Sequence, residues 1–151
     1  MDRREALTLI AELERDAARI ARVFGLRYRV IEPERPQVRR RLGVCYRDGT
    51  IRIRLFHATT RKALKYSSLV DTLCHELAHL RHFNHGRRFQ AFYRTLLEHA
   101  RLEGIYRPGA DAPPRAEPMR PRAPELAPRT PARTSAAVAA ARPAPQQLAL
   151  F

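Results

Sequence analysis

Proline is concentrated at one end of this 151-residue chain, and its distribution limits which part can fold. The last 45 residues, 107–151, hold ten of the twelve prolines. Their only large apolar side chains are those of Met119, Leu126, Val138, Leu148, Leu150 and Phe151. So few apolar groups cannot offset the conformational entropy lost when the segment becomes ordered. We therefore predict a folded domain at 1–106 and a disordered tail rich in proline, alanine and arginine at 107–151.

The charge of the chain points to an anionic partner. It has 29 Lys+Arg against 15 Asp+Glu, which gives a formal net charge of +14. Residues 1–106 carry 22 basic and 12 acidic side chains, so the predicted domain is already at +10 without its tail. A positive charge of this size is typical of proteins that bind nucleic acid. We therefore expect DNA as a partner.

Cysteine content and hydropathy exclude other classes of protein. The two cysteines, Cys45 and Cys74, are too few for a disulfide scaffold or a four-cysteine zinc module. The apolar run at 7–11 is too short for a signal peptide or a membrane span, and acidic residues follow it closely. We therefore expect a cytoplasmic protein, associated with the nucleoid where it binds DNA, and no membrane partner.

The spacing of apolar residues within 1–106 predicts a small α+β domain. The predicted elements are a helix at 7–24, strands at 26–30, 38–46 and 51–55, and helices at 67–82 and 87–101. Apolar residues recur every three or four positions in the helices and every two in the strands. Gly25 is expected to end the first helix, and Asp48-Gly49 to form a hairpin turn. This order predicts a short, mostly antiparallel sheet covered by helices.

Residues 75–79 read His-Glu-Leu-Ala-His, and this spacing suits a metal site on a helix. His75 and His79 lie about 40° apart around the helix axis, so both imidazoles can reach one Zn²⁺. Glu76 lies about 60° from His79, where it can act on water beside the ion. The apolar residues of this helix fall on the opposite side, which predicts one buried face and one face open to a cleft. The alternative is a surface helix that carries these residues by chance.

The third metal ligand has two candidates, His82 and His85. Three imidazoles in a row on a straight helix cannot surround a tetrahedral ion, so the third must follow a bend. Asn84 and Gly86 tolerate left-handed backbone and are expected to supply that bend. We therefore predict His85 as the ligand and place His82 at the rim of the site.

The segment His-Glu-Leu-Ala-His-Leu-Arg-His-Phe-Asn-His-Gly-Arg-Arg-Phe, residues 75–89, resembles the zincin motif of the YgjP-like, SprT-like and WLM metallopeptidases. The upstream Gly43-x-Cys45 and the hairpin after it also match this group in outline. The resemblance implies a zincin-like domain in which the three predicted histidines hold Zn²⁺. It also implies that Glu76 is the general base, which passes a proton from water to the leaving amine.

Several other roles stay open at this point. The donor that stabilises the developing oxyanion is one of Tyr66, Arg87, Arg88 and Tyr93. Cys74 is expected in the core, whereas Cys45 either packs or lines the cleft. A basic sheet face that contacts phosphates is expected from Arg39, Arg40, Arg41, Arg52 and Arg54, with a solvated outer face as the alternative.

The chain ends with Gln147-Leu148-Ala149-Leu150-Phe151, which resembles the peptide that binds the bacterial sliding clamp. A flexible tether would present Leu148, Leu150 and Phe151 to a hydrophobic pocket, while Gln147 makes hydrogen bonds. The resemblance implies recruitment by the replication clamp. A frayed apolar terminus is the alternative.

Together these features predict a zinc-dependent metallopeptidase that cleaves proteins associated with DNA and is recruited to DNA and the clamp. Two other functions use the same features. A metal-dependent nucleotide phosphohydrolase would exploit the positive charge, and a non-catalytic zinc-stabilised module would bind DNA without cleaving anything. The intact Glu76 argues against the second, because a purely structural metal site needs no base.

Overall fold

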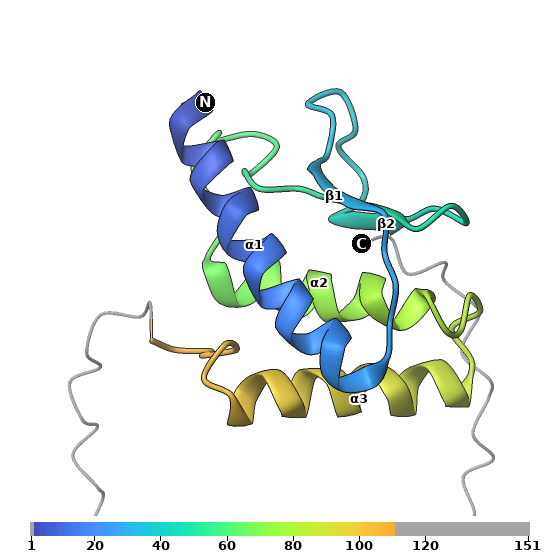
Figure 1. The fold of residues 1–151 in the computed structure, drawn as a ribbon. Coiled ribbons are helices and arrows are strands. Elements are labelled where there is room, and N and C mark those ends of the chain that lie inside the picture. The colour runs from blue at the N-terminus through green and yellow to red at the C-terminus, as the bar shows by residue number, and fades with distance from the viewer. Residues whose placement is uncertain (1, 111–151) are drawn as a thin grey trace, which may run out of the picture. The chain divides into compact units, whose positions relative to one another are not determined.

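Helices and strands follow one another in the predicted order. The computed structural model describes residues 2–110 (Figure 1). Its elements are α1 (Arg3–Phe24), β1 (Val30–Pro33), β2 (Gly43–Cys45), β3 (Thr50–Ile53), α2 (Tyr66–His79) and α3 (Arg87–Leu102). The α+β fold class is therefore confirmed. Within the described range, no helix is long and apolar enough to cross a membrane.

The first helix, α1, forms for the local reasons visible in the sequence. The Asp2 carboxylate accepts a hydrogen bond from the Arg4 N–H at 3.0 Å, which caps the first turn. Gly25 adopts left-handed backbone with φ 63°, and the Leu26 N–H bonds back to the Ala21 carbonyl. The predicted stop at Gly25 is confirmed. Leu26 takes part in this cap, so the strand predicted from 26 starts only at Val30.

The sheet has the strand order β1-β3-β2, with β1 parallel to β3 and β2 antiparallel to it. The expectation of a mostly antiparallel sheet is therefore wrong for one of the two pairs. The three strands do alternate in direction along the chain, but β3 inserts between the other two. Its Ile51 and Ile53 are fully buried, which suits the central position of a small sheet.

The predicted hairpin between β2 and β3 is present. Gly49 has φ 87°, the Gly49 N–H bonds to the Tyr46 carbonyl, and the Tyr46 N–H bonds to the Thr50 carbonyl. This three-residue turn needs glycine at its left-handed position. By contrast, the second predicted strand shrinks to Gly43–Cys45, because most of 34–42 forms a loop before it.

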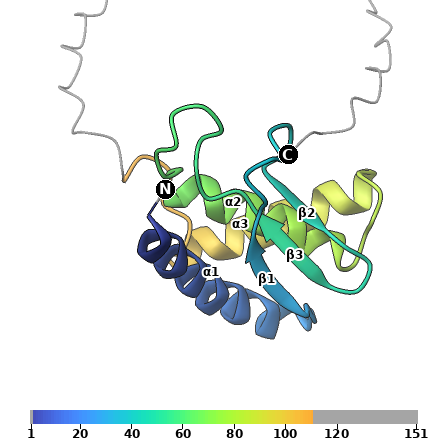
Figure 2. The ribbon, with the colours of Figure 1, turned by 90° about the horizontal axis from the view of Figure 1, so that it is seen from above.

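The second helix, α2, lies at the centre of the molecule. It contacts α1, α3, β2 and β3, and the two views show it between the sheet and α3 (Figures 1 and 2). Its apolar residues Leu69, Leu73 and Leu77 are fully buried, as predicted. The other side is covered as well, since every residue from 69 to 79 except Asp71 is buried. The side that carries the histidines is therefore less exposed than predicted, with His75 at 3% and His79 at 9%.

A buried carboxylate joins α1 to the start of α2. Asp16 on α1 is 3% exposed and accepts a hydrogen bond from the Tyr66 hydroxyl at 2.6 Å. Arg15 and Arg19 contact the same carboxylate from solvent, at 3.5 and 3.7 Å. No side chain among the described residues caps the first turn of α2. The hydrogen bond from the Tyr66 hydroxyl to Asp16 therefore fixes this end of the helix against α1.

We predict that Tyr66→Phe lowers the free energy of unfolding by about 1–2 kcal/mol, because a buried carboxylate loses one of its donors. Urea unfolding of the metal-free protein measures this effect. Tyr106→Phe is the control, since within the described residues its hydroxyl makes no hydrogen bond. Equal midpoints for Tyr66→Phe and the parent protein would contradict the role assigned to this hydroxyl.

Candidate metal centre

Three histidines converge on one point, and they are the three predicted as ligands. One ring nitrogen from each of His75, His79 and His85 lies within 4.8 Å of the other two. The Nε2 atoms of His75 and His85 are 3.1 Å apart. Nitrogens bound about 2.05 Å from a tetrahedral zinc are about 3.3 Å apart, so this cluster needs little rearrangement to hold the ion. The donor set of three imidazoles suits zinc.

The connection between α2 and α3 brings His85 back to the other two ligands. α2 ends at His79, not at 82 as predicted, and the next turn tightens with the Leu80 N–H bonded to the Leu77 carbonyl. Gly86 has φ −73°, and the only described non-glycine residue with positive φ is Arg61. Left-handed backbone at Asn84 and Gly86 is therefore not the cause of the bend. The chain bends because α2 ends at His79, three residues earlier than predicted.

His82 contributes to the centre through its backbone. Its carbonyl oxygen lies 3.2 Å from Nδ1 of His79, which must be protonated to donate there. This hydrogen bond leaves Nε2 of His79 as the atom free to bind a metal. The ring of His82 packs near Phe92, at 5.9 Å between centroids, and lies outside the ligand cluster. Its predicted place at the rim agrees with this geometry.

Phe89 on α3 packs against all three histidines. Its ring centroid lies 4.9, 4.5 and 4.8 Å from those of His75, His79 and His85. The side chain is fully buried and belongs to the hydrophobic core. The sequence interpretation missed that Phe89 also packs against the metal ligands. Its position in the first turn of the helix that follows the motif could have indicated this contact.

Burial sets the protonation of the ligands. His75 is 3% exposed, and burial together with the neighbouring His79 and His85 lowers its pKa to about 3. The pKa of His79 is lowered for the same first reason, burial, and then by His85. Both rings are therefore neutral at physiological pH, which is the form that binds a metal. His85 is exposed and leaves the centre open on that side.

Glu76 is buried beside the cluster with one oxygen unpaired. The side chain is 2% exposed, and its Oε2 has no hydrogen-bond partner among the described residues. Burial raises the pKa of Glu76 to about 8, although Arg41 and a hydrogen bond from the Cys45 N–H oppose this rise. A buried carboxyl oxygen without a hydrogen-bond partner is costly, so its retention indicates a function.

Gly43 on β2 makes the room that Glu76 occupies. A Cβ at this position would lie 2.8 Å from Oε1 of Glu76 and 2.7 Å from Cγ2 of Thr72. Any side chain here would displace the carboxylate. The sequence interpretation noted this glycine only as part of a resemblance, because a contact between residues 33 positions apart has no local signal.

The two cysteines are packing residues. Cys74 is fully buried and Cys45 is 8% exposed, and both belong to the core cluster. Burial raises the pKa of each thiol to about 12, so neither is a thiolate at physiological pH.

The four candidates for the oxyanion donor differ in whether their side chains already make hydrogen bonds within the protein. Tyr66 donates its hydroxyl to Asp16 and is thereby committed elsewhere. Tyr93 packs its ring 5.4 Å from that of His75, but its hydroxyl donates to Asp71. Arg87 and Arg88 are exposed in the first turn of α3, directly after the ligand His85 and Gly86. These two arginines are therefore the candidates whose donors are uncommitted among the described residues.

Two predictions concern residues that the structure does not describe. The clamp-binding residues Gln147, Leu148, Leu150 and Phe151 lie outside the described residues. So does nearly all of the predicted disordered tail at 107–151, of which only 107–110 are described.

Solved structures share this fold. Wss1 from Saccharomyces cerevisiae superposes with a TM-score of 0.63 at 22% identity, over 68% of this chain and 84% of that one. Wss1 from S. pombe gives a TM-score of 0.54 at 27% identity, over 63% of this chain and 80% of that one. No curated protein sequence matches the chain significantly.

A family model assigns the sequence directly. The model of the WLM domain matches residues 1–114, which include every helix and strand of the fold and all four residues of the candidate centre. This stretch is about three-quarters of the 151 residues. The chain therefore belongs to the WLM domain family.

Proposed function

We propose that the protein is a zinc-dependent metallopeptidase of the WLM type. Its family membership supports this class of enzyme. The observation that carries the proposal is the pairing of a three-histidine cluster with a buried carboxylate whose Oε2 is unpaired. A structural zinc site has four protein ligands, whereas a catalytic one has three and an open position. The cluster of His75, His79 and His85 has three and is open to solvent at His85.

The roles of the protein's own groups follow from their positions. A zinc ion at the histidines would supply a Lewis acid for the substrate carbonyl and lower the pKa of water. Glu76 takes the proton from the attacking water and returns it to the leaving amine. In the metal-free protein burial raises the pKa of Glu76, and a higher pKa makes its carboxylate a stronger base. Gly43 keeps the space that lets the carboxylate hold this position.

The strand beside Glu76 favours a peptide over a nucleotide as substrate. Within residues 2–110, β2 is an edge strand that pairs with β3 alone. The Leu42 carbonyl and the Tyr46 N–H bond toward β3, so the alternation of an antiparallel pair turns the backbone groups of Gly43 and Cys45 away from it. The Cys45 N–H is bonded to Glu76, which leaves the Gly43 N–H and the carbonyls of Gly43 and Cys45 to face a peptide. An extended peptide can add to such an edge through main-chain hydrogen bonds. Its scissile bond would then pass close to Glu76.

We predict that Glu76→Gln keeps one zinc per chain but loses peptide hydrolysis by several orders of magnitude, since the amide cannot take up the proton. Elemental analysis after dialysis and cleavage of casein measure the two properties. His85→Ala should lose the metal, whereas His82→Ala, which keeps the backbone carbonyl, should retain it.

The same assays distinguish the alternatives. Hydrolysis of nucleotides but not of casein, abolished by Glu76→Gln, would identify a phosphohydrolase. Full activity of Glu76→Gln on casein would reject the mechanism. Zinc binding with no hydrolysis of either substrate would leave the DNA-binding module.

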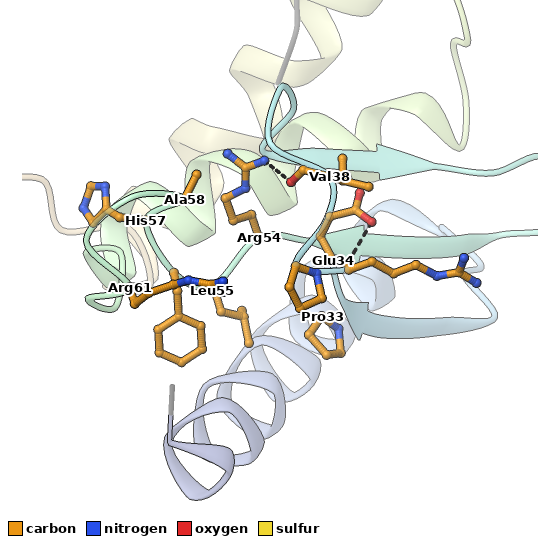
Figure 3. Close-up of a pocket in the computed structure, with 11 residues that line it drawn as sticks. Pro33, Glu34, Val38, Arg54, Leu55, His57, Ala58 and Arg61 are labelled. Carbon is orange, nitrogen blue, oxygen red and sulfur yellow. Dashed lines mark hydrogen bonds between the residues drawn. The ribbon is translucent and has the colours of Figure 1, made fainter.

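We further propose that the substrates are proteins associated with DNA. The predicted basic sheet face is largely engaged within the protein, because Arg41 pairs with Glu34 at 2.7 Å and Arg52 with Glu32 at 3.2 Å. The loops at 34–42 and 54–65 provide other cations. Arg54 donates to the Val38 carbonyl and joins the two loops, which together line a crevice of about 30 Å³ (Figure 3).

The exposed cations of these two loops are the proposed phosphate contacts. They are Arg35, Arg39, Arg40, Arg61, Lys62 and Lys65, and none forms an ion pair within residues 2–110. The one carboxylate in the crevice, Glu34, already accepts from Arg41 and from the Arg35 N–H. The loops therefore have an excess of unpaired positive charge, which attracts a polyanion.

We predict that replacing Arg39, Arg40 and Arg61 with Gln weakens duplex DNA binding and reduces its salt dependence, by about 0.9 in log K against log salt for each phosphate that the variant no longer neutralises. Fluorescence anisotropy across a salt series measures this. The control removes the same charge from exposed arginines at other places, Arg22, Arg27 and Arg94. An equal weakening in the two variants would show that net charge, and not these loops, determines binding.

Recruitment by a sliding clamp is a separate proposal that depends on the last five residues. A peptide of the last ten residues should bind isolated bacterial clamp with micromolar affinity, since a flexible peptide loses conformational entropy on binding. Leu150→Ala with Phe151→Ala should abolish binding, because these side chains bury most apolar surface. Isothermal titration calorimetry measures it, and no binding by the parent peptide would reject this proposal.

A further inference from the structure

The connection 80–86 carries two groups on which the metal centre depends. The His82 carbonyl holds the tautomer of His79, and His85 is the third ligand. Neither Asn84 nor Gly86 uses left-handed backbone, and the N-terminus of α3 has no side-chain cap. Turn chemistry therefore does not account for the fixed path of this segment. Contacts with other elements must do so.

Arg81 makes the strongest such contact. Its guanidinium donates a hydrogen bond of 2.6 Å to the carbonyl of Phe24, the last residue of α1. A charged donor at the C-terminus of a helix is favoured by the helix dipole and satisfies a carbonyl that lacks an intrahelical partner. Among side chains of residues 80–86, it is the only one with a hydrogen bond to an element outside the metal centre. It therefore ties the connection to α1.

The same guanidinium lies over an aromatic ring of α3. Its Cζ is 4.3 Å from the centroid of Phe92, within the range of a cation–π interaction. Phe92 also meets the rings of Phe24 and His82, each at 5.9 Å. Arg81 thus contacts the end of α1 through Phe24 and the face of α3 through Phe92. Its neighbour in sequence, His82, packs against the same Phe92 ring. A shift of Arg81 would move the carbonyl that orients His79.

The opposite side of the connection has a looser contact. Arg47, at the tip of the β2–β3 hairpin, lies with Cζ 5.7 Å from the ring of Phe83, which is 49% exposed. This distance is near the limit of a cation–π interaction, and Arg47 makes no side-chain hydrogen bond within the described residues, whereas Arg81, which is also exposed, adds a hydrogen bond to its closer ring contact. Arg81 is therefore the residue on which the position of the connection mainly depends.

We propose that Arg81 is a positioning residue of the metal centre. By holding the connection against α1 and α3, it keeps the His82 carbonyl and His85 in the geometry that binds zinc. Its guanidinium contacts the Phe24 carbonyl and the Phe92 ring, and not the rings of the three ligands. This inference rests on the proposed function, since it takes His75, His79 and His85 as ligands of zinc.

The test is the equilibrium affinity for zinc, measured by competition with a chromogenic chelator. Loss of a group that orients a ligand typically weakens metal binding by 10–100-fold, so we expect Arg81→Ala to weaken it by about tenfold or more. Arg81→Lys should recover part of the loss, because a lysine keeps the positive charge near the ring and the carbonyl. Arg94→Ala is the control, an exposed arginine of α3 whose side chain makes no hydrogen bond or ion pair within the described residues.

Each outcome bears on the proposal. Unchanged zinc affinity in Arg81→Ala, with a lower melting temperature of the metal-free protein, would overturn it and leave Arg81 a role in fold stability alone. If Arg81→Ala does not fold, Arg81→Met removes the guanidinium, and with it both the hydrogen bond to Phe24 and the contact with Phe92, while it keeps an aliphatic side chain; unchanged zinc affinity there would also overturn the proposal. Failure of the parent protein to bind zinc would reject the proposed function itself.

Discussion

The burial of α2 from residue 69 to residue 79, with Asp71 as the exception, is the constraint on which the rest of the structure depends. The helix places leucines and polar groups at the centre of a domain of about a hundred residues, so each polar group must be matched to its surroundings. His75 and His79 stay neutral, and Phe89 covers them. Glu76 is accommodated only because Gly43 has no side chain. Burying these polar groups lowers the stability of the fold but provides a metal site and a base, which is common at functional centres.

Local patterns were sufficient to predict the helices and the main ligands. The amphipathic spacing of α1 and α3, the stop at Gly25 and the hairpin at Gly49 all arise from interactions within a few residues. The convergence of His75 and His79 follows from helix geometry alone. Placing His85 with them required only a bend somewhere after the helix, although the predicted origin of that bend in Asn84 and Gly86 was wrong.

Features that depend on tertiary contacts could not be predicted in this way. The insertion of β3 between β1 and β2 is decided by burial of Ile51 and Ile53 against α2, which no local alternation specifies. Likewise, the amino-acid composition gives the number of arginines but does not show which of them form ion pairs. Glu32 and Glu34 neutralise the sheet face from elsewhere in the sequence, and the unpaired charge lies on the adjacent loops.

The short length of β2 affects how a substrate could be selected. A strand of three residues, Gly43–Cys45, offers an incoming peptide only a few backbone hydrogen bonds. Such bonds do not discriminate between side chains, and a three-residue edge is also a poor template for self-association. A protein could therefore be cut only where it yields a stretch of unfolded chain, whatever its sequence. Selectivity among target proteins would then depend on how readily a target unfolds locally and on how long it stays close to the metal centre.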